Sequence, residues 1–215
     1  MAVRRYLFIR HAKTAGNIER RYIGRTDEPL CEEGVAEAEA LRKSGLLPPI
    51  DTLISGTAKR CRQTAELLFP DVSYALCPLT EIDFGIFEGK SADDLLGDSD
   101  YEKWLEAYCM GDIPGGDGVS GFKQRCCEAF GRIAGEGVTS DARVAGGACV
   151  AGGARGFHTT ALVLHGGNIM AILERLAYPQ QGFYEHHLPN CGFLLCRYEN
   201  GRLYTEQQGS AACSS

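Results

Sequence analysis

Histidine and arginine side chains stand directly after apolar segments at two points of the chain, and a third basic cluster opens a helix. Arg10 and His11 follow a strand predicted at 3–9, and His165 follows the apolar run 161–164. Arg60 lies near the start of a helix expected after a short strand at 51–55. Ligands of open α/β sheets bind beyond the carboxyl ends of the parallel strands. We therefore expect these four side chains to meet at one edge of a sheet.

Two arginines and two imidazoles at one edge predict a phosphate site. Guanidinium groups bind phosphate oxygens in a bidentate manner and stay charged at any working pH. Imidazole titrates near neutrality, so one ring can attack phosphorus while the other donates hydrogen bonds. Gly166 and Gly167 precede a predicted helix, whose N-terminal amides would add donors for an anion. Since no set of metal ligands is evident, fixed cations would have to balance the phosphoryl charge, with no cofactor.

Each of these signals has a plain structural alternative when it is taken singly. Arg10 and His11 could form a surface pair, His165 could be a turn residue, and Arg60 could be a solvated helix residue. The phosphate site is favoured because all of them fall at strand exits, where catalytic groups are expected.

Strands alternate with helices along the chain, which predicts the elements that must position these groups. Asn200-Gly201 between two apolar runs is a strong hairpin signal, and Thr57 is the expected N-cap of the helix that carries Arg60. We expect an α/β fold of three layers, α/β/α, with a mainly parallel sheet and an antiparallel edge. The strands are predicted at 3–9, 51–55, 72–77, 161–164, 191–198 and 202–207, and the helices at 31–43, 57–68, 101–108, 122–136 and 168–177.

A single domain is expected over 1–208, with two departures from regular structure. The excursion at about 90–121 is predicted to form a lid over the site. The segment at about 140–157 contains the repeat VAGGA at 144–148 and 150–154, which predicts a flexible loop. Residues 209–215 are expected to be a disordered tail.

Composition limits the classes of function. The chain has 215 residues and a net charge of −6, which argues against a nucleic-acid or membrane-surface binder. Residues 1–5 lack the apolar run of a signal peptide and no apolar stretch is long enough to span a membrane, so we expect a cytoplasmic protein. The 10 cysteines include no C-x-x-C pair, so we expect thiols rather than a zinc site.

The segment 7–17 (LFIRHAKTAGN) resembles the opening motif of the histidine phosphatase superfamily, the phosphoglycerate mutase-like proteins. Later motifs of that family have counterparts here in the same order. They are 22–30 (YIGRTDEPL), 53–65 (LISGTAKRCRQTA), 81–89 (EIDFGIFEG), 114–117 (PGGD) with 122–125 (FKQR), and 163–167 (VLHGG). The resemblance covers about residues 6–198 and implies the phosphoglycerate mutase-like fold.

The resemblance also implies roles for individual residues. His11 would be the nucleophile that becomes phosphohistidine, and Arg10, Arg60 and His165 would surround the phosphoryl group. Glu81 would protonate the leaving oxygen and then activate water, a role that suits a carboxyl group partly removed from water.

Further phosphate or substrate contacts are implied for Asn17, Gly24 and Gly166. Asp83 and Glu88 are rivals of Glu81 for the acid. Ala12 stands where the family usually has glycine, and Lys13, where it often has an acid, would either add charge at the mouth of the site or point into solvent.

The lid segment bears on the reaction. A mutase needs extra cations to retain a bisphosphorylated intermediate, yet residues 90–121 hold only Lys90 and Lys103 among many acids. Hydrolysis of a small phosphate ester by a monomer or homodimer is therefore favoured. The stretch 101–114 is similar to α-ribazole phosphatases, and Tyr101, Trp104 and Tyr108 would either stack on a heteroaromatic leaving group or pack the lid. A cofactor-dependent phosphoglycerate mutase and a non-catalytic phosphate-binding module remain the alternatives.

Overall fold

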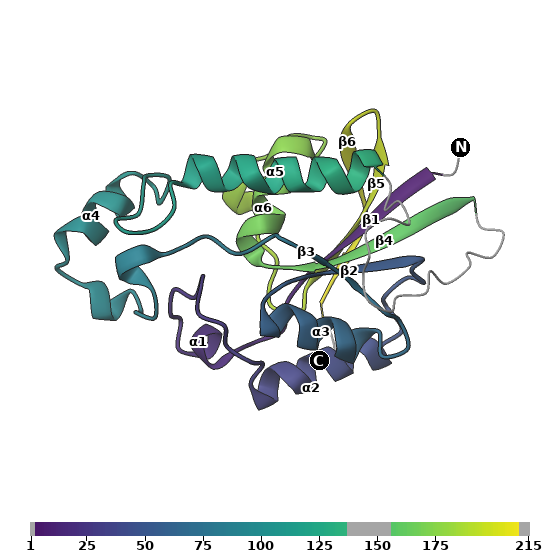
Figure 1. Cartoon of the computed structure of the whole chain (residues 1–215), viewed down its shortest axis with the longest axis horizontal. Coiled ribbons are helices and arrows are strands. Elements are labelled where there is room, and N and C mark those ends of the chain that lie inside the picture. Colours follow the sequence, from purple (N-terminus) through teal and green to yellow (C-terminus); the bar gives the residue numbers. More distant parts are fainter. Residues whose placement is uncertain (1–2, 137–155, 211–215) are drawn as a thin grey trace.

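A mixed sheet of six strands lies at the centre of the fold (Figure 1). The structure is a computed structural model that describes residues 3–136 and 156–210. The sheet order is β3-β2-β4-β1-β5-β6, in which β1 pairs in parallel with β4 and antiparallel with β5. The parallel part with its antiparallel edge is therefore confirmed. The strands are β1 (Val3–Arg10), β2 (Thr52–Gly56), β3 (Ala75–Cys77), β4 (Phe157–Leu164), β5 (Phe193–Glu199) and β6 (Arg202–Gly209).

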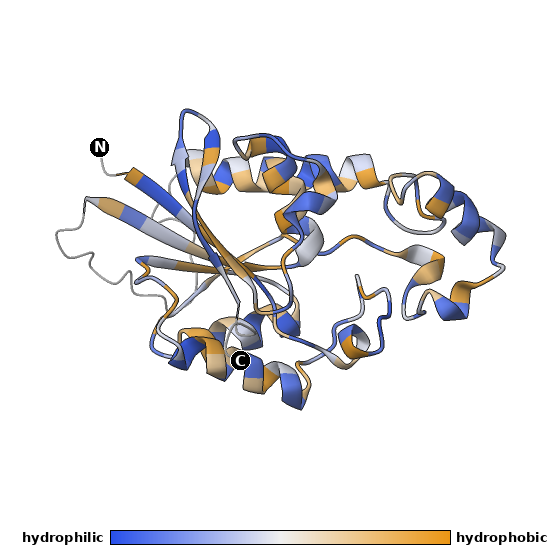
Figure 2. Ribbon diagram, turned by 180° about the vertical axis from the view of Figure 1, so that it is seen from behind, coloured by the Kyte–Doolittle hydropathy of each residue, from blue (hydrophilic) through white to orange (hydrophobic). Residues whose placement is uncertain are grey.

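Helices cover both faces of this sheet, which confirms the three-layer prediction (Figure 1). One face carries α2 (Glu32–Lys43) and α3 (Lys59–Leu68), and the other carries α5 (Val119–Glu136) and α6 (Gly166–Leu176). Both faces need a cover because successive side chains of a strand point to opposite faces of the sheet, as β1 illustrates. Tyr6 and Phe8 join the core under α5 and α6, whereas Leu7 and Ile9 join the core over α2 and α3. The inner strands are correspondingly hydrophobic where the helices cover them (Figure 2).

The chain segments that lie beyond the carboxyl ends of the parallel strands form the rest of the fold (Figure 1). They comprise α1 (Ala15–Ile18), the 3-10 turns η1 (Gly85–Phe87) and η2 (Asp93–Leu95), and α4 (Ser99–Glu106). A further 3-10 turn, η3 (Phe183–His186), precedes β5. Aromatic side chains join the lid segment to the main core: Tyr101 and Trp104 of the lid pack against Tyr22, whose hydroxyl shares a hydrogen bond with that of Tyr101 at 2.8 Å.

Several helix starts differ from the sequence prediction: α5 begins at Val119 rather than at 122, and α6 at Gly166 rather than at 168. The N-cap of α3 is Ala58 rather than Thr57, and its side chain makes no capping hydrogen bond. The Asp27 carboxylate instead accepts from the amide of Lys59 at 2.6 Å, so a distant loop caps the helix. Helix α4 begins at Ser99, earlier than predicted, because the Asp98 side chain accepts from the amides of its first turn.

The predicted strand at 72–77 is shortened to Ala75–Cys77, whereas the Asn200-Gly201 hairpin is confirmed, with φ of 51° and 76° at these residues. Strand β6 continues to Gly209, so the start of the predicted tail at 209 is wrong. Most of the predicted loop at 140–157, including the VAGGA repeat, and residues 211–215 lie outside the described residues. Within the described ranges, no helix combines the length and hydrophobicity that a membrane crossing requires.

Candidate active site

The register between β1 and β4 brings the two predicted histidines together. Arg10 pairs with Leu164, and the amide of His11 donates to the carbonyl of Leu164 at 2.9 Å. The next residue of each strand is therefore a histidine at the same edge. The ring centroids of His11 and His165 lie 5.3 Å apart, with the ring planes at 71°. Both side chains are buried, with 4% and 1% of their surface exposed.

Arg60 enters the site from the first turn of α3 and is 1% exposed. Its Nε donates to Nδ1 of His165 at 3.2 Å. Its Nη1 and Nη2 donate to the carbonyls of Thr26 and Gly24 at 2.7 and 2.9 Å. The guanidinium is thus fixed by neutral acceptors alone.

Arg10 is held in a similar way on the other side of the site. Its Nη1 donates to the carbonyl of Leu188 at 2.8 Å and lies 3.0 Å from Nε2 of His187, while its buried Nε has no partner. Among the residues that the structure describes, neither Arg10 nor Arg60 has a carboxylate within 4.0 Å. Buried cations without a counter-ion are costly unless an anion completes them. The pair is therefore suited to bind an anionic ligand.

Hydrogen bonds fix the tautomers of both imidazoles. Nδ1 of His11 lies 2.8 Å from the carbonyl oxygen of Ala12, which can only accept, so Nδ1 carries the proton and Nε2 keeps its lone pair. Arg60 can only donate to Nδ1 of His165, so the proton of that neutral ring is on Nε2. Burial, followed by the charges of Arg60 and neighbouring groups, holds the pKa of each histidine well below its ordinary value. One ring can act as a nucleophile and the other as a hydrogen-bond donor.

Glu81 reaches the same edge from the loop after β3. Its Oε2 accepts from the amide of Gly167 at 3.1 Å, at the N-terminus of α6, and its Oε1 accepts from the amide of Ile82 at 3.0 Å. Desolvation raises the pKa of Glu81 despite these hydrogen bonds and the charges of Arg10 and Arg60. A raised pKa is what a proton donor near neutrality requires.

The two rivals of Glu81 have structural contacts. Glu88 accepts from the amides of Gly24 and Thr26 through Oε1, at 2.9 Å each. Asp83 accepts from the amide of Gly85 at 3.0 Å and pairs with Arg25. Only Glu81 binds the start of α6, through the amide of Gly167, two residues after His165, which favours Glu81 as the acid.

Asn17, Gly24 and Gly166, the three further contacts predicted for phosphate or substrate, differ in their surroundings. Oδ1 of Asn17 accepts from the amide of Thr14 and from Nδ2 of Asn190, so the side chain could offer an anion only its Nδ2 donors. The amide of Gly24 is engaged by Glu88 and its carbonyl by Arg60, so neither group is free for phosphate, although Gly24 lines a cavity together with His165 and its predicted substrate contact stays a prediction. Gly24 instead allows a close approach, because a Cβ there would lie 1.9 Å from the carbonyl oxygen of Ile82.

Gly166 adjoins Arg10, and a Cβ built on it would lie 3.3 Å from the arginine Nε. The amide of Gly167 donates to the carboxylate of Glu81, so this helix-start amide binds a protein carboxylate instead of being free for phosphate. Lys13 adds no charge at the mouth of the site, because Glu33 and Glu37 neutralise it at 2.5 and 2.7 Å. Ala12 is buried in the core over α2 and α3.

Sequence reasoning missed the segment 187–190, which completes the site from the antiparallel side. His187 and Leu188 contact Arg10, and Nδ2 of Asn190 donates to the carbonyl of His11 at 3.0 Å. The signal was two histidines and an asparagine just before the buried strand that pairs with β1. An antiparallel neighbour of β1 starts at the edge where β1 ends.

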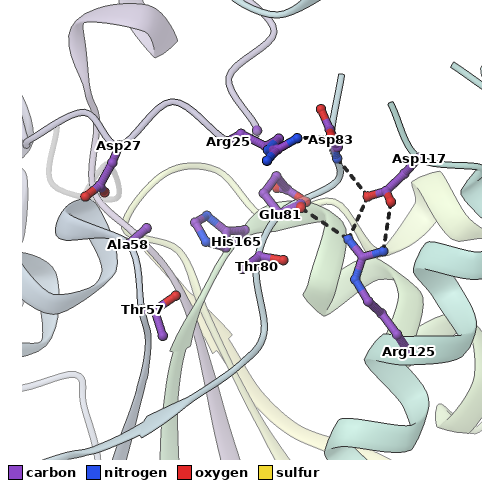
Figure 3. Close-up of a pocket in the computed structure, with 11 residues that line it drawn as sticks. Arg25, Asp27, Thr57, Ala58, Thr80, Glu81, Asp83, Asp117, Arg125 and His165 are labelled. Carbon is purple, nitrogen blue, oxygen red and sulfur yellow. Dashed lines mark hydrogen bonds and ion pairs between the residues drawn. The ribbon is translucent and has the colours of Figure 1, made fainter. Parts of the chain in front are cut away.

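Two cavities meet at Glu81. One, of about 450 Å³, is polar and includes His165, Arg25 and Arg125 with several carboxylates (Figure 3). The other, of about 340 Å³, is largely apolar and extends from Arg10, Glu81 and Gly166 towards the lid. Its aromatic lining consists of Tyr22, Phe84, Trp104, Phe122, Phe183 and Tyr184.

The three aromatic residues of the lid that were candidates for stacking on the substrate differ in burial. Tyr101 and Trp104 are 4% and 6% exposed and pack the lid, as the plainer interpretation has it, although Trp104 also lines the apolar cavity. Tyr108 is 83% exposed.

The eight cysteines in the described ranges are free thiols, and Sγ of Cys61 lies 3.6 Å from Nε2 of His165. The described residues contain no cluster of three or more histidine, cysteine or acidic side chains arranged for a metal.

The fold and the site define an α/β protein with two facing histidines and two arginines at the carboxyl edge of its sheet. Comparison with known proteins gives the family: residues 6–209 match the histidine phosphatase superfamily (branch 1), and the chain belongs to it.

Solved structures share this fold. The α-ribazole phosphatase from Shigella flexneri has a TM-score of 0.78 with 21% identity, over 98% of both chains. The phosphoglycerate mutase from Thermus thermophilus has a TM-score of 0.66 with 27% identity, over 95% of this chain and 97% of that one. Among curated sequences, "Probable phosphoglycerate mutase GpmB" of Salmonella choleraesuis (strain SC-B67) is 29% identical over 125 residues. That match spans 54% of this chain and 57% of the length of the relative.

Proposed function

We propose that this protein is a metal-independent phosphomonoesterase that acts through a phosphohistidine on His11. Nε2 of His11 attacks phosphorus, and the bond between phosphorus and the ester oxygen breaks. The leaving alkoxide takes the proton of Glu81. The Glu81 carboxylate then accepts a proton from the water that attacks the phosphohistidine, which releases phosphate and restores both residues.

The observation that carries this proposal is the pairing of an unprotonated imidazole nitrogen with two arginines that have no carboxylate partner among the described residues. Nδ1 of His11 is held by Ala12, so Nε2 is the nucleophile. Arg10 and Arg60 would bind the equatorial phosphoryl oxygens, where charge is spread in the transition state. The proton on Nε2 of His165 would add a further donor.

The charges around the two cavities support hydrolysis over phosphoglycerate isomerisation. In the polar cavity, Arg25 and Arg125 are paired with Asp83 and Asp117, and Asp27 adds a further carboxylate. The apolar cavity contains no arginine or lysine besides Arg10. Apart from Arg10, which would bind the transferred phosphoryl group, neither cavity therefore offers an unpaired arginine or lysine to the second phosphate or carboxylate of a mutase substrate.

The apolar cavity supports a substrate whose alcohol part carries an aromatic or heteroaromatic ring. Aromatic walls favour stacking on a planar ring, and this cavity shares Arg10 and Glu81 with the phosphate site. α-Ribazole 5′-phosphate is the candidate that combines these features, and a structural neighbour is an α-ribazole phosphatase.

A panel of phosphomonoesters that includes α-ribazole 5′-phosphate, sugar phosphates and nucleotides tests this proposal, with a chelator present throughout. We expect phosphate release that is unaffected by the chelator and lost in His11→Ala, with the highest kcat/KM on aromatic or heteroaromatic esters. Incubation with 3-phosphoglycerate and its bisphosphate primer is the parallel assay. Formation of 2-phosphoglycerate without phosphate release would contradict hydrolysis, and inactivity on every ester would favour the binding module.

A further inference from the structure

The loop that carries Glu81 has no regular secondary structure of its own between Cys77 and Gly85. The carboxylate itself is held by two amides, those of Ile82 and Gly167. A Cβ at Gly167 would lie 2.2 Å from Oε1 of Glu81, so the carboxylate sits directly against the start of α6. What fixes the backbone of this loop must come from elsewhere in the molecule.

The backbone of the Glu81 loop is joined to a second loop, residues 112–118. The amide of Asp83 donates to Oδ2 of Asp117 at 2.8 Å, and the amide of Asp117 donates to the carbonyl of Asp83 at 3.0 Å. The loops approach so closely that a Cβ at Gly116 would lie 2.3 Å from the Asp83 carbonyl oxygen. The two loops are therefore held together as one packed unit, with Asp117 at their junction.

Arg125 joins this unit to a helix of 18 residues, α5. Its Nη1 and Nη2 donate to the two oxygens of Asp117 at 3.0 and 2.6 Å, and Nη2 also lies 3.4 Å from the carbonyl oxygen of Glu81 (Figure 3). The guanidinium lies 5.0 Å from the ring centre of Phe122, which is buried in the core. Bidentate pairing of this kind fixes direction as well as distance.

The shifted pKa values of Asp117 and Arg125 favour the charged forms that their ion pair requires. Burial alone would raise the pKa of Asp117, yet hydrogen bonds from Arg125 and from the amide of Asp83 hold the pKa below its ordinary value. The hydrogen bond with Asp117 raises the pKa of Arg125. Both groups stay charged throughout the pH range in which Glu81 would work.

We propose that the Asp117–Arg125 ion pair is a positioning device for Glu81, which holds the acid loop at the distance that proton transfer to the leaving oxygen requires. This inference rests on the proposed function, because it assigns the pair a role in the step that Glu81 performs. A proton donor must lie within hydrogen-bond reach of the leaving oxygen, and small displacements of a reacting group cost large factors in rate. Loss of the ion pair should therefore impair protonation of the leaving group and leave phosphate binding intact.

Leaving-group dependence separates this role from general destabilisation. p-Nitrophenolate leaves its phosphate ester without taking a proton, whereas the alkoxide of an alkyl phosphate needs a proton to leave. For both substrates, kcat/KM reports the steps up to the departure of the leaving group. We expect Arg125→Met and Asp117→Asn to lower kcat/KM on an alkyl phosphate by at least about tenfold, and on p-nitrophenyl phosphate by less than about threefold, since general acids contribute about 10²–10⁴. Arg125→Lys should restore part of the loss, because it keeps the charge and loses the fork.

Glu81→Gln supplies the benchmark and the test of coupling. It should show the same selective loss, and adding Arg125→Met to it should cost nothing more, because the ion pair acts through Glu81. The matched control is Arg5→Gln. This change removes the ion pair between Arg5 on β1 and Glu206 on β6, whose side chains are about as exposed as those of Arg125 and Asp117. It should leave both substrates unaffected.

Three results would overturn the proposal. They are equal losses on both substrates, full additivity in the double variant, and unchanged kinetics in Asp117→Asn and Arg125→Met alike. If Glu81→Gln itself shows no selective loss, the role of Glu81 in the proposed function falls as well. A selective loss in Glu81→Gln alone would refute only the positioning role of the ion pair.

Discussion

Arg60 donates from its Nε to Nδ1 of His165 at 3.2 Å, with both side chains almost completely buried. This hydrogen bond keeps the imidazole neutral with its proton on Nε2, because a second donor at Nδ1 would repel the guanidinium. The same positive charge lies near His11 and lowers its pKa, second only to burial. Burial and this one arginine thus act together to keep both histidines neutral.

The pH dependence of kcat/KM follows from these shifts. Since the folded protein lowers the pKa of His11, the nucleophile stays unprotonated as the pH falls below the ordinary histidine value of about 6.5. The acid limb of the profile with an aryl phosphate should therefore lie below that value. In Arg60→Met the limb should move upward, because one of the charges that oppose protonation is gone. An acid limb at the same pH in both proteins would contradict the role given to Arg60. Both proteins are compared on the same aryl phosphate, so the ionisation of the substrate affects both profiles equally.

Inorganic phosphate should stabilise the folded protein, because it supplies the missing counter-ion of Arg10 and Arg60. Binding to the native state alone contributes about 2.7 kcal/mol at a ligand concentration of 100 times Kd. Thermal unfolding with and without phosphate measures this as a rise in Tm. The rise should vanish in Arg60→Met and persist in Arg5→Gln, whereas an equal rise in both variants would indicate binding elsewhere.

Gly24→Ala should destabilise the protein by about 1–3 kcal/mol, the usual cost of an overpacked site. The reason is the 1.9 Å separation between the added Cβ and the carbonyl oxygen of Ile82, which is backbone and cannot move alone. Gly131→Ala, in α5, is the matched control because nothing lies within 4 Å of its Cβ. That change should stabilise by up to about 1 kcal/mol. Denaturant unfolding of both variants checks the pair, and similar behaviour would contradict the close approach at Gly24.

The sequence predicted the parts of this site that lie at the ends of parallel strands. His11 and His165 follow buried apolar runs, and the rule that parallel strands end at one edge was enough to bring them together. The layers and the antiparallel edge followed from alternation and from the Asn200-Gly201 hairpin. These are local signals, and they need no knowledge of which side chains touch.

The contacts that depend on distant loops could not be predicted in that way. Ala58 replaces Thr57 as the N-cap because the Asp27 carboxylate reaches the helix from another segment. Gly24 was assigned to phosphate, although its amide is engaged by Glu88 in a loop 64 residues away. His187 and Asn190 join the site only through the pairing of β5 with β1. In each case the partner is fixed by tertiary packing.

Glu81→Gln should accumulate a phosphorylated protein when it is given p-nitrophenyl phosphate. The first step needs no acid with this leaving group, but hydrolysis of the phosphohistidine needs the carboxylate as a base. A burst of nitrophenol followed by slow turnover is the expected time course. Steady turnover at the wild-type rate without a burst would show that another group activates water.

The most direct test of the phosphohistidine is to quench the reaction with a ³²P-labelled aryl phosphate in alkali and to locate the label by peptide mapping. We predict label on His11, stable to alkali and labile to acid, in the wild-type protein and at higher occupancy in Glu81→Gln. His11→Ala should carry none and should release no phosphate. Label on any other residue, or turnover retained by His11→Ala, would contradict the account.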